Sequence, residues 1–172
     1  MRGGGPNFSR AIEETLSEFH RLRAEDAQFS ALIRLGEVEL MLEKISAAEK
    51  AHWRGVLSGI DFQASLVERD WPELHENISK IRRLAESDRK LQFEELCLVL
   101  SLRLGVKCAL AYLSTANMTI EIDALKLIDE LLIEMAKDDK TRQAMTSAAA
   151  FISKNRGGVF LPSELLPQSW MH

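Results

Sequence analysis

Glu49 and His52 are the residues whose spacing first suggests chemistry. They form an E-x-x-H pattern, which places a carboxylate and an imidazole on one helix face, one turn apart, as a pair of metal ligands requires. Di-iron sites in helical bundles use two such patterns and two further inward glutamates. No other histidine of the chain has a glutamate three residues before it. The pattern therefore predicts a solvated glutamate beside a histidine near a helix end, and we expect no metal and no other cofactor.

His75 lies between Glu73 and Glu76, and these three residues are a second candidate for chemistry, as an acid–base cluster. The same glutamates suit the first turn of a helix, where negative charge is favoured by the helix dipole. The chain contains no G-x-S-x-G motif, no P-loop and no G-x-G-x-x-G motif. We therefore expect a protein that is not an enzyme.

A basic cluster follows in the chain. Its members are Lys80, Arg82, Arg83, Arg89 and Lys90. Such a cluster can bind nucleic acid or an acidic partner, and the alternative is a solvated helix face. The net charge of −4 and the lack of interleaved aromatic residues both count against a nucleic-acid binder.

The stretch from Ile120 to Asp139 has the opposite charge. Two lysines, Lys126 and Lys137, are outnumbered there by acidic residues. The acidic residues are Glu121, Asp123, Asp129, Glu130, Glu134, Asp138 and Asp139. An acidic face keeps a domain soluble or meets a basic partner. It can also meet the basic cluster of a second copy, which would give a homo-oligomer.

The last fifteen residues, 158–172, form an apolar C-terminal arm with two prolines. Its large apolar side chains are Val159, Phe160, Leu161, Leu165, Leu166 and Trp170. They are too apolar to be left free in water. The arm either folds back over a groove of its own domain or inserts into a partner or a second protomer, and aromatic anchors are common at such interfaces.

These surfaces need a scaffold, and its centre is the stretch from Leu91 to Leu113. This stretch has helical spacing and is apolar at nearly all angles, with Arg103 and Lys107 as a thin polar stripe. Those two cations interrupt the apolar run, so the pattern predicts a buried core helix rather than a membrane span. Cys97 and Cys108 would lie about 16 Å apart on this helix, too far for a disulfide.

Amphipathic helices are predicted on both sides of this core helix. The first begins after Ser9. The second carries Arg34 and Glu37 on its outer face and runs on past Ile45 toward Gly59. A short helical piece is expected from Ile60 to Arg69, and further helices begin near Pro72, Thr119 and Asp139.

The predicted fold class is therefore all-α: one domain of about six to seven helices, arranged as an antiparallel bundle or a short stack of helical hairpins. Residues 1–8 form a flexible leader, residues 9–157 the helical domain and residues 158–172 the extended arm.

Three dipeptides recur about 34 residues apart: Leu35-Gly36, Arg69-Asp70 and Leu104-Gly105. This period resembles the tetratricopeptide repeat, a helix–turn–helix unit of 34 residues. The resemblance implies a stack of helical hairpins. In its size, charge and 34-residue period, the chain loosely resembles small acidic chaperones built of tetratricopeptide hairpins.

The expected function is a non-catalytic protein–protein interaction module, such as an adaptor, a chaperone-like factor or a regulatory subunit. It binds another protein through a helical surface, through the C-terminal arm, or through both. The alternative is a nucleic-acid-associated regulator that uses the basic face from Lys80 to Lys90. Two unpaired cysteines and the lack of an apolar leader predict a cytoplasmic location without membrane contact.

Overall fold

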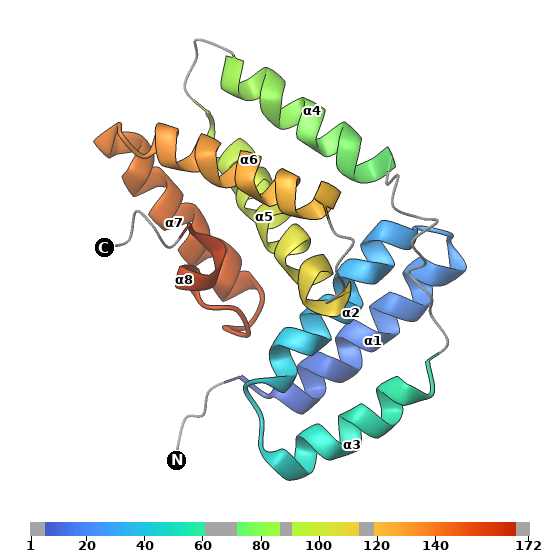
Figure 1. The fold of residues 1–172 in the computed structure, drawn as a ribbon. Coiled ribbons are helices and arrows are strands. Elements are labelled where there is room, and N and C mark those ends of the chain that lie inside the picture. The colour runs from blue at the N-terminus through green and yellow to red at the C-terminus, as the bar shows by residue number, and fades with distance from the viewer. Residues whose placement is uncertain (1–5, 61–71, 87–90, 114–118, 168–172) are drawn as a thin grey trace, which may run out of the picture. The chain divides into compact units, whose positions relative to one another are not determined.

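The structure, a computed structural model, describes residues 6–60, 72–86, 91–113 and 119–167. Within these ranges all regular structure is helical, so the predicted all-α class is confirmed (Figure 1). The helices are α1 (Phe8–Ala24), α2 (Gln28–Leu42), α3 (Ala47–Ser58), α4 (Pro72–Glu86), α5 (Phe93–Leu113), α6 (Thr119–Met135), α7 (Asp139–Asn155) and α8 (Pro162–Leu165). The helical piece expected after Ile60 lies outside the described residues.

The chain divides into two compact units. Unit 1 contains α1, α2, α3 and the end of α5 from Cys108, and unit 2 contains α4, the rest of α5, and α6 to α8. Helix α5, which the sequence predicts as the core helix, therefore contributes to both units. None of the described helices is long and apolar enough to cross a membrane.

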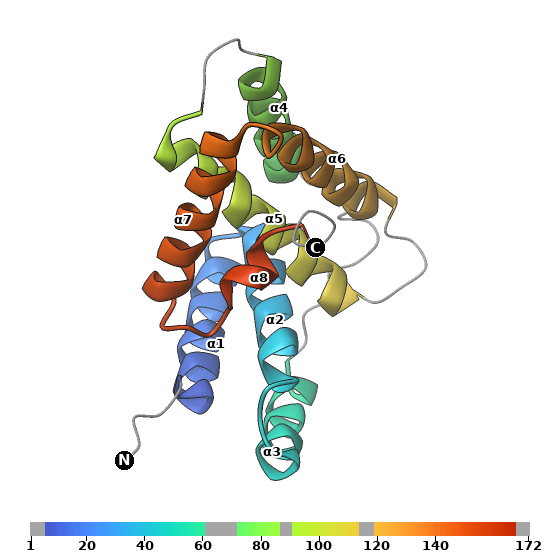
Figure 2. The ribbon, with the colours of Figure 1, turned by 90° about the vertical axis from the view of Figure 1, so that its left-hand side faces the viewer.

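Helices α1 and α2 form an antiparallel hairpin in unit 1 (Figure 2). The predicted apolar stripe of α1 is buried at Ile12, Leu16 and Phe19. The predicted start of α1 is shifted, because the side chain of Asn7, not of Ser9, accepts the capping hydrogen bond from the backbone of Arg10 at 3.1 Å.

Two sequence predictions for α2 are wrong. Glu37 does not lie on an outer face: it is 1% exposed, and it accepts a hydrogen bond from Arg34 at 2.9 Å. The helix also ends at Leu42 instead of running on. Ser46 starts α3, because its hydroxyl accepts from the backbone of Glu49 while it donates to the carboxylate of that residue.

Gly36 of α2 fixes how closely α2 and the end of α5 approach within unit 1. A Cβ atom at Gly36 would lie 1.9 Å from the backbone oxygen of Cys108. No carbon atom fits at that distance, and the obstacle is backbone rather than a side chain that can rotate. Only glycine allows this crossing.

In unit 2, α6 and α7 both contact the first part of α5. Apolar residues of α5, α6 and α7 are fully buried, and among them are Leu96, Leu100, Leu104, Ile128, Leu132 and Met145. The Asp138 carboxylate caps α7, since it accepts from the backbone and the hydroxyl of Thr141, at 3.0 and 2.7 Å. The arm, which the sequence predicts to be extended, contains the single helical turn α8.

We predict that Gly36→Ala lowers the free energy of unfolding by about 3 kcal/mol or more, because the added methyl group forces α2 and α5 apart. Gly55→Ala is the matched control. It lies in α3 with open space around its Cβ position, so it should raise stability by about 0.5–1 kcal/mol. Urea unfolding of both variants tests this, and a Gly36→Ala variant as stable as the parent protein would refute the close crossing.

Candidate interaction surfaces

Glu49 has a structural task. One of its carboxylate oxygens accepts from the Ser9 hydroxyl and the other from the Ser46 hydroxyl, both at 3.0 Å. These hydrogen bonds hold the pKa of the Glu49 carboxyl below its ordinary value, the bond from Ser9 contributing most. The His52 ring packs edge-to-face on Trp53, with ring centroids 5.0 Å apart. The E-x-x-H pattern therefore ties α1 to the start of α3, and in the described part of the chain no three potential ligands are grouped as a metal requires.

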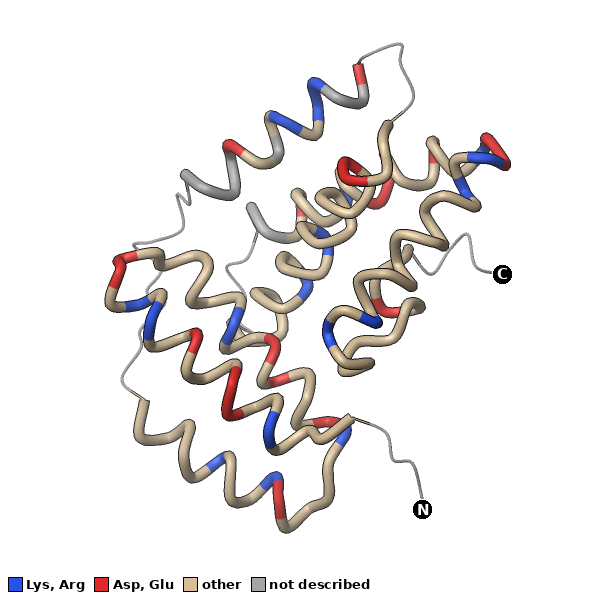
Figure 3. The backbone as a smooth tube through the Cα atoms, turned by 180° about the vertical axis from the view of Figure 1, so that it is seen from behind, with Lys and Arg blue, Asp and Glu red and all other residues tan. Residues whose placement is uncertain are grey.

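The basic cluster is partly placed. Lys80, Arg82 and Arg83 are exposed on α4, and they appear as blue segments of that helix in Figure 3. Lys80 approaches Glu76 to 3.7 Å on the same helix. Arg89 and Lys90 lie outside the described residues, as does the side chain of His75.

The acidic stretch forms α6 and the turn that follows it, and α4 packs beside α6 in unit 2. The acidic residues do not act as one face. Asp129 bonds inward to Arg103, whereas Glu134 and Asp139 form exposed ion pairs with Lys137 and Arg142 on neighbouring turns. Exposed pairs of this kind add little stability.

A shallow hollow of about 250 Å³ lies where α6 ends and α7 begins. It is lined by Ile133, Ala136, Lys137 and Arg142. Both cations are already paired with carboxylates on the surface, and the hollow is open to solvent. The hollow offers no enclosed space in which a substrate could be held away from water.

The C-terminal arm packs against its own unit. Of the two arrangements that the sequence leaves open, this is the one in which the arm folds back. Phe160 and Leu165 are 0% exposed and Leu166 is 4% exposed, while Leu161 is 54% exposed. The Arg156 guanidinium stacks over the Phe160 ring at 5.0 Å from its centroid. Trp170 lies outside the described residues. The docked arm therefore presents Leu161 to solvent and keeps its other described apolar side chains inside.

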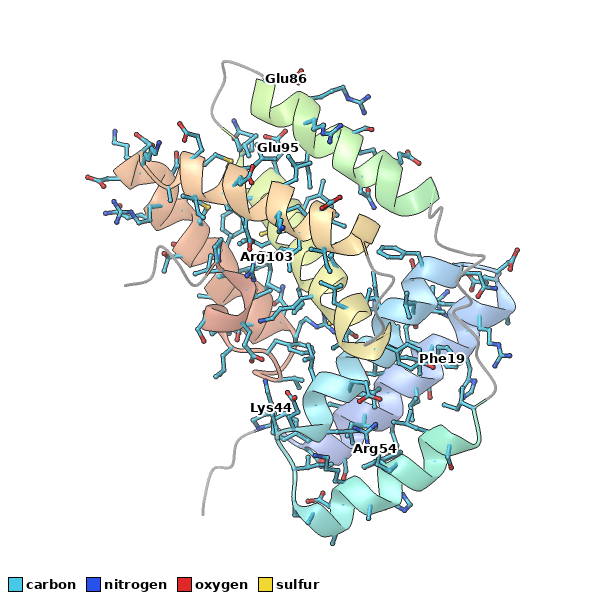
Figure 4. The ribbon with its side chains drawn as sticks, viewed as in Figure 1. Phe19, Lys44, Arg54, Glu86, Glu95 and Arg103 are labelled. Atoms are coloured by element: carbon cyan, nitrogen blue, oxygen red, sulfur yellow. The ribbon has the colours of Figure 1, made fainter. Side chains whose placement is uncertain are left out.

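Arg103 holds the arm in place. It lies on α5, where Figure 4 labels it, and its side chain is buried. Its Nε donates to the Asp129 carboxylate at 2.6 Å, and one terminal nitrogen donates to the backbone oxygen of Glu164 at 3.1 Å. One guanidinium thus connects α5, α6 and α8. We call the Arg103 guanidinium, the Asp129 carboxylate and the Glu164 backbone oxygen the Arg103 clamp. The sequence placed Arg103 on a polar stripe, but the spacing could not show that this stripe is covered.

Phe93 and Phe151 form a pair of exposed aromatic rings that the sequence did not reveal. Their centroids lie 5.5 Å apart in an edge-to-face arrangement between α5 and α7. Phe93 is 39% exposed and Phe151 is 48% exposed. Sequence reasoning assigned Phe93 to the core and gave Phe151 no role. The available signal was that Phe151 stands one residue before Ile152, off the buried stripe of α7.

The described residues next to this aromatic pair include apolar, polar and charged side chains. Cys97 is half-buried one helical turn from Phe93, and burial raises the pKa of its thiol, with a smaller contribution from Glu94. On α7 the exposed residues one turn from Phe151 are Ser147, Lys154 and Asn155. Among the described residues, the two rings therefore form an apolar patch that is bordered by the charged side chains of Glu94 on α5 and Lys154 on α7.

Comparison with known proteins identifies no relative: no family model, no curated protein and no solved structure matches this chain. The 34-residue period accordingly remains a resemblance in spacing. Function has to be argued from the surfaces described above.

We predict that Arg103→Leu lowers the free energy of unfolding by about 2–4 kcal/mol, because it leaves the Asp129 carboxylate and the Glu164 carbonyl without their buried donor. Arg142→Leu is the control. It removes an exposed ion pair and should cost less than about 1 kcal/mol. Chemical unfolding measures both values, and equal costs for the two variants would refute the clamp.

The tie through Glu49 should depend on pH. Because its folded pKa is lowered, the tie stabilises the fold above the ordinary pKa of 4.5 and is lost as the pH falls through the folded value. The stability difference between the parent protein and Glu49→Gln should therefore be present at pH 6 and vanish in stronger acid. Thermal unfolding across this range tests it. A difference that does not change with pH would show that the carboxylate charge plays no part.

Proposed function

We propose that this protein is a non-catalytic protein–protein interaction module, and that Phe93 and Phe151 are the centre of its binding surface. The observation that carries the proposal is the edge-to-face pair of exposed rings on two helices of unit 2. Aromatic residues, phenylalanine among them, are enriched in the buried cores of protein interfaces.

The pairing of the two rings supports a binding role. An isolated exposed phenylalanine is ordinary on a protein surface, but two rings in contact form one apolar patch. Each ring restricts the other, so little conformational freedom is lost when a partner covers them. A partner that presents apolar side chains fits the apolar surface of the two rings.

The titratable residues considered for chemistry in the described part of the chain have structural partners. Glu49 bonds to two serine hydroxyls, and Glu76 lies 3.7 Å from Lys80 on the same helix. This assignment favours binding over catalysis. Cys97 and Cys108 form no disulfide with each other, which supports the cytoplasmic location that we include in the proposal.

A second candidate function is nucleic-acid binding by α4. The observation in its favour is that Lys80, Arg82 and Arg83 are all exposed on this one helix. Cationic side chains that neutralise phosphates give an affinity that falls steeply with salt. Arg82→Glu combined with Arg83→Glu should abolish such binding, and a salt-insensitive affinity would exclude it.

We predict that Phe93→Ser combined with Phe151→Ser weakens partner binding by at least about 2 kcal/mol, which is roughly 30-fold in the dissociation constant. The variant should remain folded, because the ring pair adds only about 0.5–1.5 kcal/mol beyond its buried area. A co-purifying protein can be identified with the parent chain, and its affinity for both chains measured by calorimetry.

Val56→Ser is the matched control, since Val56 is 39% exposed on α3 of unit 1. It removes a similarly exposed apolar side chain and should leave the affinity unchanged. A partner that binds the double variant as tightly as the parent protein would contradict the proposal. So would a partner whose affinity depends equally on Val56.

A further inference from the structure

We propose that the arm segment Val159–Leu166 exchanges between two copies of this chain, so that the arm of each copy fills the arm site of the other. The arm site is the part of unit 2 that the arm covers, including Arg103, Asp129 and Arg156. This proposal is independent of the aromatic patch formed by Phe93 and Phe151.

The contacts between the arm and its site are of a kind that a second copy reproduces without change. Phe160 and Leu165 are fully buried, and Arg103 recognises the backbone oxygen of Glu164. Phe160, Glu164 and Leu165 all lie beyond the glycine pair that connects the arm to α7, whereas Arg103 belongs to the site. An identical arm from another chain therefore makes the same contacts, which is why exchanged elements give dimers at little cost.

The connection itself can open. Gly157 and Gly158 have φ angles of +68° and +75°, a left-handed conformation that turns the chain back after α7. Their backbone N–H groups donate to Lys154 and Ser153 and so close the end of that helix. An arm that extends toward a second copy does not need this turn, and glycine adopts extended and left-handed conformations about equally readily.

The balance between the two forms is set by concentration. A short tether holds the arm near its own site at an effective concentration on the order of millimolar. At micromolar protein the arm therefore docks within its own chain. Exchange becomes favourable when the tight turn is made costly, because the open form does not contain it.

Gly157→Ala combined with Gly158→Ala tests this directly in the full chain. A Cβ atom at either position meets no other atom within 4 Å, so the substitution adds backbone strain without a clash. At each position, alanine populates the left-handed conformation about tenfold less than glycine does. We expect the dimer dissociation constant to fall by at least about tenfold, as measured by sedimentation equilibrium. Gly55→Ala, in open space on α3, should not change it.

A mixing experiment identifies the exchanged element. We call the chain with Gly157→Ala and Gly158→Ala the hinge variant. In this background, Arg103→Leu damages the arm site but keeps the arm, and Leu165→Asp damages the arm but keeps the site. Each chain alone should be monomeric, and their mixture should form a 1:1 dimer. Circular dichroism checks that both chains are folded. Removing the aromatic patch by Phe93→Ser and Phe151→Ser should leave this dimer intact.

Three results would overturn the proposal: hinge variants that stay monomeric with the arm released, a mixture that forms no 1:1 dimer, or a dimer that persists when both chains carry Leu165→Asp. The first would show that the site accepts only the arm of its own chain. The last would place the dimer contact elsewhere. The hinge measurement stands even if one of the damaged chains fails to fold.

Discussion

The buried guanidinium of Arg103 is the constraint on which unit 2 depends. Helix α5 is so apolar that it buries most of its circumference, and a cation on such a helix must be given acceptors or pushed into solvent. Asp129 and the Glu164 carbonyl supply those acceptors from α6 and α8. Their positions are therefore fixed by one side chain, and the C-terminal arm, which otherwise packs through apolar contacts, acquires a specific register.

Unit 1 depends on a constraint of the opposite kind, the absence of a side chain at Gly36, which lets α2 lie against the backbone of Cys108. Sequence periodicity predicted α5 and the buried face of α1, because apolar spacing reports which side of a helix is covered. It could not predict the Arg103 clamp or the burial of Glu37, because both depend on segments distant in the chain. It missed the break between α2 and α3, although the Ser46 and Glu49 capping pattern was present.

The candidate surfaces show the same limit. Composition identified the basic residues of α4 and the apolar arm, since both are local features of the sequence. The contact of Phe93 with Phe151 joins residues 58 positions apart, and spacing within either helix carries no trace of it. The sequence predicts that the arm folds back or binds elsewhere. In the proposed exchange, the folded-back arm and the arm bound to a second copy make the same contacts. The proposed binding surface and the proposed exchangeable arm both lie in unit 2.

Residue-resolved hydrogen exchange at the Leu161 and Glu164 amides tests the central claim that Arg103 holds the arm in its site. Both amides are hydrogen bonded at the start of α8, Leu161 to the Glu164 carboxylate and Glu164 to the Leu161 carbonyl. The account predicts protection of both amides in the parent protein, and its loss in Arg103→Leu while amides of α1 in unit 1 stay protected. Exchange in the parent protein as fast as in a free peptide would contradict it.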